Sequence, residues 1–228
     1  MIVGNMLISS TIPILMCVCA LHSDKTKVEL DFYNDGMKIG TGSYEEIFDR
    51  KAGQKTSIFK IIGTGKGGGK LVITQTKVID RSAYPLSEKE VTEEIGGRSP
   101  SRTVSEVTYD DTGTAILRLI TSKGRTVRTF NPPRGYSRAD VSDLWFSWIP
   151  NVTPGTTVQS TVFDIEKPSW QRIETKYVGK TWITVSGHSI ECHEVQDIRD
   201  GNARKLYLDD HGMPVLMING PFRTEKHF

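Results

Sequence analysis

Three side chains in a short stretch, His188, Cys192 and His193, form the most concentrated group in the sequence that could bind a soft metal or act as a nucleophile. Zinc sites use histidine and cysteine at paired spacings, and a cysteine nucleophile needs its base within hydrogen-bond range. Successive side chains of a strand point to opposite faces, so His193 lies on the other face from His188 and Cys192. We therefore expect no metal site and no catalytic residue here, and Cys192 as a small buried residue.

The glycine-rich segment Gly63-Thr64-Gly65-Lys66-Gly67-Gly68 has the spelling G-x-G-x-x-G. In dinucleotide-binding proteins this spelling precedes a helix whose N-terminus holds a pyrophosphate. Here it precedes the strand-like run Lys70-Leu71-Val72-Ile73-Thr74, and Leu71 stands where a P-loop needs Ser or Thr. We interpret the segment as a hairpin loop and predict no cofactor. The alternative is anion binding by Lys66 and Lys70.

The carboxylates fall mainly in turns, such as Asp110, Asp111, Asp209 and Asp210, where aspartate accepts hydrogen bonds from nearby backbone amides. The sequence contains neither a G-x-S-x-G elbow nor a Ser-x-x-Lys motif at the start of a helix. These observations predict that the protein is not an enzyme.

Turn residues recur along the chain, and runs rich in Val, Ile, Thr, Trp and Tyr lie between them. Asn34-Asp35-Gly36 predicts a first hairpin, and the last sixty or so residues predict an antiparallel meander. In that meander we expect turns at Tyr177-Val178-Gly179, Ser186-Gly187, Asp200-Gly201-Asn202, Asp209-Asp210-His211-Gly212 and Asn219-Gly220. Expected strands cover 28–33, 37–48, 55–62, 70–79, 86–95, 102–109, 115–121, 125–130, 157–165, 172–177, 181–185, 189–198, 205–208 and 215–218.

One segment has a helical pattern instead. Ser137-Arg138-Ala139-Asp140 resembles a capping box, and Val141, Leu144, Trp145 and Trp148 follow at three-to-four-residue spacing before Pro150. This pattern predicts one short amphipathic helix that lies against the sheet. Trp145 and Trp148 either belong to the core or line a ligand cavity.

The first twenty residues contain no Asp, Glu, Lys or Arg, and the apolar run from Met6 to Leu21 is too short to span a bilayer. We interpret residues 1–20 as a signal peptide with a cleavage site at Val18-Cys19-Ala20, and residues 21–228 as a single β-rich domain. An uncleaved anchor and a buried N-terminal segment are the alternatives. Export predicts a periplasmic or extracellular location, with no transmembrane span in the mature chain.

Composition excludes one class of partner. The 29 basic and 27 acidic residues leave a net charge of only +2, and the two signs are interspersed, so we expect no nucleic-acid partner. Cleavage would leave Cys192 alone, without an intrachain disulfide.

Several segments of the sequence resemble exported bacterial proteins of the DUF3108-like kind, which look related in fold to the lipoprotein carriers LolA and LolB. They are segments 35–42, 143–145, 177–180 and 207–215, together with Pro154-Gly155, Gly187, Ile190 and Cys192. The resemblance implies a strongly curved antiparallel sheet, an incomplete barrel, with one short helix packed on its concave side. It brings no catalytic motif.

A curved sheet with too few side chains to fill it leaves a groove for an apolar ligand. We therefore expect a non-enzymatic binding protein that holds a lipid or lipoprotein acyl chain, or another apolar ligand, in a β-gutter. The alternative is a structural or protein-interaction module of the cell envelope with a packed cavity. The candidate lining residues are Trp145, Trp148, Phe163, Trp182 and Ile190.

Overall fold

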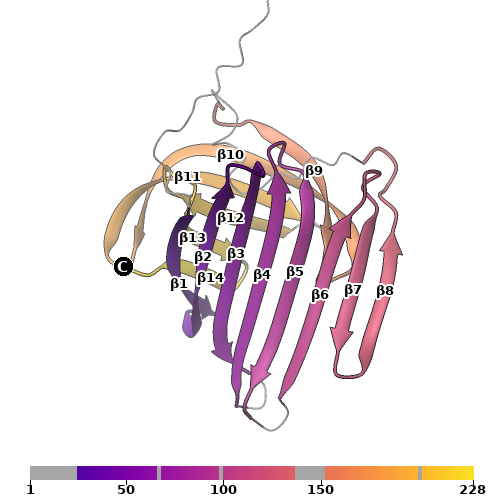
Figure 1. Cartoon of the computed structure of the whole chain (residues 1–228). Coiled ribbons are helices and arrows are strands. Elements are labelled where there is room, and N and C mark those ends of the chain that lie inside the picture. The colour runs from indigo at the N-terminus through magenta and orange to yellow at the C-terminus, as the bar shows by residue number, and fades with distance from the viewer. Residues whose placement is uncertain (1–24, 66–67, 98–99, 137–151, 200–201) are drawn as a thin grey trace, which may run out of the picture.

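The computed structural model describes residues 25–65, 68–97, 100–136, 152–199 and 202–228, which form fourteen strands in a single antiparallel sheet (Figure 1). The strands are β1 (Lys25–Asn34), β2 (Met37–Asp49), β3 (Gln54–Thr64), β4 (Lys70–Asp80), β5 (Pro85–Ile95), β6 (Ser101–Tyr109), β7 (Ala115–Thr121), β8 (Gly124–Phe130), β9 (Thr157–Asp164), β10 (Ser169–Val185), β11 (His188–Arg199), β12 (Asn202–Leu208), β13 (Pro214–Asn219) and β14 (Phe222–Lys226). The prediction of a mainly β protein with one large antiparallel sheet is confirmed.

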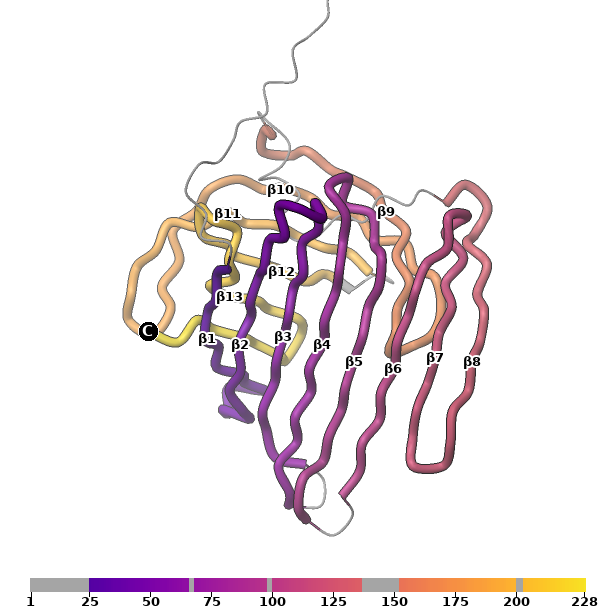
Figure 2. Tube along the Cα trace, viewed as in Figure 1, coloured from indigo at the N-terminus to yellow at the C-terminus, as the bar shows by residue number. Residues whose placement is uncertain are grey.

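The sheet consists of two meanders, β1–β8 and β9–β14. Every hydrogen-bonded pair of neighbours is consecutive in the sequence except β1 and β14, which join the two meanders from Leu30↔Lys226 to Asn34↔Phe222. In Figure 2 the strands of the second meander run at a steep angle behind those of the first. The sheet is therefore strongly curved, and β8 and β9 form its two edges.

The tight hairpins follow from local turn chemistry. Asp35 and Gly36, between β1 and β2, have φ values of 48° and 78°, and Ser186 and Gly187, between β10 and β11, have values of 49° and 83°. Two consecutive residues with positive φ form the turn type whose twist matches the flanking strands. Both predicted turns are confirmed.

Aspartate side chains shape the longer turns. The Asp110 Oδ1 atom accepts hydrogen bonds from the backbone amides of Thr112 and Thr114, each at 2.9 Å. Asp209 Oδ1 does the same for the amides of His211 and Met213, again at 2.9 Å. These carboxylates are occupied in structural roles, as their turn positions predict.

The two edges of the sheet meet through side chains, at a cluster that we call the aromatic seam: Tyr109, Phe130, Tyr136, Phe163 and Trp170. The Phe163 ring centroid lies 5.0 Å from that of Phe130 and 5.4 Å from that of Trp170. The buried side chains of Val107, Ala115 and Leu117 support the seam from β6 and β7. The sheet thus closes by packing where no ladder of backbone hydrogen bonds joins β8 to β9.

The β10–β11 hairpin corrects one prediction. The sequence predicts a turn at Tyr177-Val178-Gly179, but β10 continues through these residues, and its register against β11 shifts between Tyr177 and Gly179. Gly179 has a φ of 132°, which glycine tolerates and other residues rarely adopt. The predicted turn is therefore a β-bulge in one long strand.

Beyond the bulge, the tip of this hairpin folds back against the C-terminal strands. Ser186 Oγ lies 3.5 Å from Glu225 Oε2, and the rings of His188 and Phe228 stack with centroids 4.6 Å apart. The fold-back buries a cluster that we call the outer core: Val185, Cys192, Val215 and Leu216, with Ile183, Ile190, Tyr207 and Ile218 packed around them.

The predicted helix, with Trp145 and Trp148, falls on residues 137–151, which lie outside the described residues. The described part of the chain contains no helix, and hence none long and apolar enough to cross a membrane. Residues 1–20, the predicted signal peptide, also lie outside the described residues.

Candidate binding cavity

A cavity of about 670 Å³, partly open to solvent, lies between the two meanders. Apolar side chains line it from both walls, with Phe32, Phe59 and Ile61 on the first meander and Leu206, Leu208 and Met217 on the second. Alternate residues of a strand share one face, which explains why Phe59 and Ile61 face the same space, as do Leu206 and Leu208. The volume lies within the range of small-molecule binding sites.

An aromatic group forms one side of this apolar wall. Phe32 and Phe59 meet edge to face at a centroid distance of 5.7 Å, and the centroids of Tyr44 and Phe59 are 6.4 Å apart. Tyr44 and Phe59 are direct cross-strand partners on β2 and β3. The Tyr44 hydroxyl donates a hydrogen bond to Glu46 at 2.7 Å, which satisfies its polar end.

Both meanders contribute to an acidic cluster in the lining. The side-chain amide of Gln75 on β4 donates to Glu90 on β5 at 2.8 Å and to Glu166, in the turn between β9 and β10, at 3.2 Å. Burial raises the pKa of Glu166, and the negative charges of Glu90 and Asp164 raise this pKa further, against the hydrogen bond from Gln75. The amide thus bridges two carboxylates that repel each other.

The second meander contributes a charged cluster centred on Asp197, whose residue is only 2% exposed. Its carboxylate pairs closely with Arg204, lies 3.6 Å from Arg199 and accepts a hydrogen bond from Thr175 at 2.8 Å. Both arginines line the cavity. A buried carboxylate is tolerable when charge and hydrogen bonds compensate it in this way.

The structure separates the predicted lining residues. Phe163 lines the cavity and belongs to the aromatic seam. Trp182 lies apart from the cavity and is 67% exposed, and Ile190 packs in the outer core. Neither residue lines this cavity, because the fold-back of the hairpin beyond the bulge at Gly179 carries both away from it. Trp145 and Trp148 lie outside the described residues.

The cysteine and histidine cluster is also dispersed. Cys192 is 1% exposed in the outer core, and burial raises the pKa of its thiol to about 11. His193 points elsewhere, with Nδ1 2.9 Å from the Tyr177 hydroxyl and Nε2 3.1 Å from Asp210. The predicted alternation of faces is confirmed. Among the described residues, no group of His, Cys, Asp and Glu is arranged to hold a metal ion.

The glycine-rich segment joins β3 to β4 as a hairpin connection. The amide of Gly65 donates to the Gly69 carbonyl at 2.7 Å, and the amide of Gly68 donates to the Gly65 carbonyl at 3.0 Å. A strand follows, as the sequence predicts. Lys66 and Gly67 lie outside the described residues.

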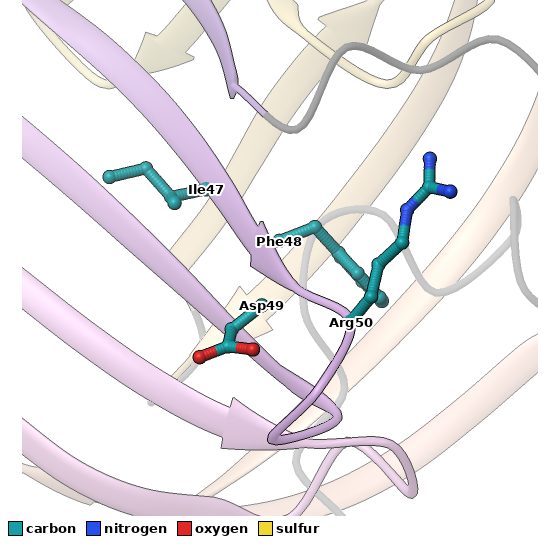
Figure 3. Close-up of a pocket in the computed structure, with 4 residues that line it drawn as sticks. All are labelled: Ile47, Phe48, Asp49 and Arg50. Carbon is teal, nitrogen blue, oxygen red and sulfur yellow. The ribbon is translucent and has the colours of Figure 1, made fainter.

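A second recess, of about 390 Å³, lies at the end of β2 and is lined by Ile47, Phe48, Asp49 and Arg50 (Figure 3). Figure 3 shows that the side chains of Ile47 and Phe48 extend to opposite sides of the strand. Asp49 accepts a hydrogen bond from the backbone amide of Ala52 at 2.8 Å, and the carbonyl of Arg50 accepts one from Arg81 at 3.0 Å. These polar contacts hold a turn, and we assign no binding role to the recess.

Sequence reasoning missed most of the lining. Phe32, Tyr44, Phe59, Leu206 and Met217 occupy strands that the sequence predicts, but alternation alone does not tell which face turns inward. The acidic and arginine clusters were missed because charged residues on half-buried strands are usually assigned to solvent.

Comparisons with known proteins bear on the fold. No protein-family model matches the sequence, and no curated protein matches it. A solved structure that resembles this chain is the β-barrel-like protein of domain of unknown function DUF1849 from Brucella abortus. The two chains share 12% sequence identity with a TM-score of 0.52, over 88% of this chain and 94% of that one. The likeness shows a β-barrel-like fold; the DUF3108-like and LolA-like resemblance stays a prediction.

Proposed function

We propose that this protein is an exported, non-enzymatic binding protein that holds an acyl chain or another elongated apolar ligand in its cavity. The observation that carries the proposal is the space of about 670 Å³ between two walls that present Phe59, Ile61, Leu206 and Met217 to it. In a fully packed core, voids are hardly larger than a water molecule.

The energetics favour an apolar occupant. Each methylene moved from water into an apolar site contributes about 0.8 kcal/mol, so a chain of about ten carbons gains about 8 kcal/mol before ordering costs are subtracted. The curved sheet supplies the walls without the ligand, so those ordering costs fall mainly on the ligand itself. Long, flexible apolar chains are suited to such a preformed gutter.

The polar groups near the cavity have structural partners that explain their presence. Glu90 and Glu166 share the Gln75 amide, and Asp197 is engaged by Arg204 and Thr175. The thiol of Cys192 lies in the outer core with a raised pKa, which disfavours the nucleophilic thiolate. These assignments support a binding role rather than a catalytic one.

Location in the cell envelope is part of the proposal and rests on the uncharged segment 1–20. Expression of the full chain with a C-terminal tag, followed by cell fractionation, tests it. The tagged protein should appear outside the cytoplasm and lose the mass of residues 1–20. A chain without residues 2–20 should remain in the cytoplasm, and equal distribution of the two forms would contradict export.

Ligand binding is tested by native mass spectrometry of the purified protein before and after organic extraction, and by thermal shift with dodecanoic acid and dodecanol. We expect added mass that extraction removes, and a higher melting temperature with either compound. Ile61→Trp, which fills the cavity, should reduce both effects. Ile120→Trp, a matched change at a partly exposed position away from the cavity lining, should reduce neither.

The second candidate function is the envelope interaction module with a packed cavity. Two results together would favour that candidate and overturn the first. The extracted protein would show no thermal shift with either compound, and Ile61→Trp would raise stability without changing the binding of any ligand.

A further inference from the structure

Strand β8 is an open margin of the sheet. It pairs with β7 alone among the described strands, and Figure 1 shows it at the end of the first meander. From Gly124 to Thr129 every residue is exposed. Backbone N–H and C=O groups of an antiparallel strand alternate in direction, so part of them face away from β7 and can pair with another strand.

The β7–β8 hairpin is strongly one-sided in charge. The sequence from Thr112 to Ala139 contains six Lys and Arg residues and no Asp or Glu, in a chain whose charges otherwise nearly balance. Three of these cations, Lys123, Arg125 and Arg128, form no ion pair in the part of the chain that the structure describes. Two exposed cations on the preceding strands are paired instead: Lys89 lies 2.8 Å from Glu106, and Arg102 lies 2.9 Å from Glu93.

The arrangement of these cations selects the kind of strand that can add. Arg125 and Arg128 lie on opposite faces of β8, because they are three residues apart in an extended strand. Val127, which is 54% exposed, lies on the same face as Arg125. A second copy of β8 would bring like charges together, which disfavours self-pairing. A strand with carboxylates meets opposite charge on either face.

The free stretch has a defined end. At Phe130 the backbone carbonyl accepts the Trp170 indole N–H at 3.4 Å, and the aromatic seam covers the strand from there. The length open to pairing is therefore Gly124 to Thr129, which matches an ordinary strand of about six residues.

We propose that β8 is a docking edge for an extended, acidic segment of a partner protein, which adds to the sheet as a fifteenth strand. Main-chain hydrogen bonds hold the segment, and Lys123, Arg125 and Arg128 select its charge. This interaction goes beyond the proposed function, because it uses the outer margin of the sheet and not the cavity.

The test is binding of a capped peptide of about eight alternating Glu and Val residues, measured by fluorescence anisotropy at low salt. We expect the Lys123→Glu, Arg125→Glu, Arg128→Glu variant to bind about tenfold more weakly. The matched control, Lys51→Glu, Lys60→Glu, Lys70→Glu, makes the same change in net charge at three exposed positions and should bind as the parent does. Added salt should weaken binding.

Two further probes separate strand addition from simple charge attraction. A peptide with Gln in place of Glu should bind weakly, and one with proline at alternate positions should not bind, because proline cannot donate to the ladder. Equal binding of the proline peptide, equal loss in both charge variants, or the absence of binding would overturn the proposal. The proposal would also be overturned if the parent protein bound vesicles of anionic lipid as tightly as it binds the peptide.

Discussion

The indole Nε1–H of Trp170, in β10 beside the edge strand β9, donates a hydrogen bond to the backbone carbonyl of Phe130, in the edge strand β8, across 3.4 Å. The two residues are forty positions apart in the sequence and belong to different meanders. This contact and the surrounding rings stand where a closed barrel would have a ladder of backbone hydrogen bonds.

Removal of the indole should therefore weaken the whole domain. We expect Trp170→Ala to lower the free energy of unfolding by about 3 kcal/mol, because the change empties the aromatic seam. The matched variant Trp182→Ala removes the same side chain at a position that is 67% exposed, and it should change the free energy of unfolding by less than about 0.5 kcal/mol. Urea unfolding measures both, and equal losses would show that the seam does not hold the edges together.

Asp197 should be among the polar residues that matter most for stability. Asp197→Asn removes the negative charge that Arg204 and Arg199 share, and we expect a loss of about 3 kcal/mol or more. Asp210→Asn offers a control, because the Asp210 side chain is 70% exposed in its pair with Lys180. This variant should lose less than about 1 kcal/mol of the free energy of unfolding. Urea midpoints that fall equally in the two variants would contradict a special role for the buried cluster.

Cys192 should be inert in the native protein. Its thiol is buried and its pKa is raised to about 11, so the reactive thiolate is scarce at pH 8. In a Cys17→Ser, Cys19→Ser background, we expect maleimide to label Cys192 only at urea concentrations that unfold the domain. Rapid labelling without urea would show that the outer core is open.

The same thiol gives stability a defined pH dependence at the alkaline end. The folded pKa is higher than the ordinary value of 9.0, so the contribution of the thiol is complete below pH 9 and declines as pH rises toward 11. Cys192→Ala should flatten this decline. Melting temperatures of the parent and the variant, measured between pH 8 and 11, test this prediction. If the two proteins showed the same decline with pH, the decline would not come from the Cys192 thiol.

Glu166 should destabilise the protein when it ionises. The pKa of Glu166 is raised above the ordinary value of 4.5 by burial and by the charges of Glu90 and Asp164. The contribution of the protonated form to stability is therefore complete below pH 4.5 and is lost as pH rises through the folded pKa. Glu166→Gln should therefore lose less stability than the parent between pH 4 and pH 7. Asp111→Asn, in an exposed turn, controls for the loss of one negative charge. If the free energy of unfolding had the same pH dependence in all three proteins, repulsion between the carboxylates would not contribute to stability.

The hairpins were predictable because their causes are local. Asn34-Asp35-Gly36 and Asp110 carry their turn geometry in their own side chains and φ preferences, so the sequence predicts them without knowledge of the rest of the fold. The sequence predicts a turn where the bulge at Gly179 lies, because a glycine in a strand and a glycine in a turn look alike until the partner strand is known.

The cavity was less predictable, because its lining depends on contacts that are distant in sequence. Phe163 lies in the cavity lining and Trp182 does not, since the environment of Trp182 depends on how the β10–β11 hairpin bends. The presence of Glu166 beside Gln75, ninety-one residues away, depends on the closure of the whole sheet. Strand periodicity describes each strand but not its distant neighbours.

The pairing of β1 with β14 determines how the chain can assemble. Each meander can form by adding one hairpin at a time, with short loops and little loss of chain entropy. Among the described strands, the pairing from Leu30↔Lys226 to Asn34↔Phe222 is the ladder that must wait for both meanders to be present. The two meanders are thus natural units of local folding, and amide hydrogens bonded in the β1–β14 ladder should gain protection only after those bonded within each unit.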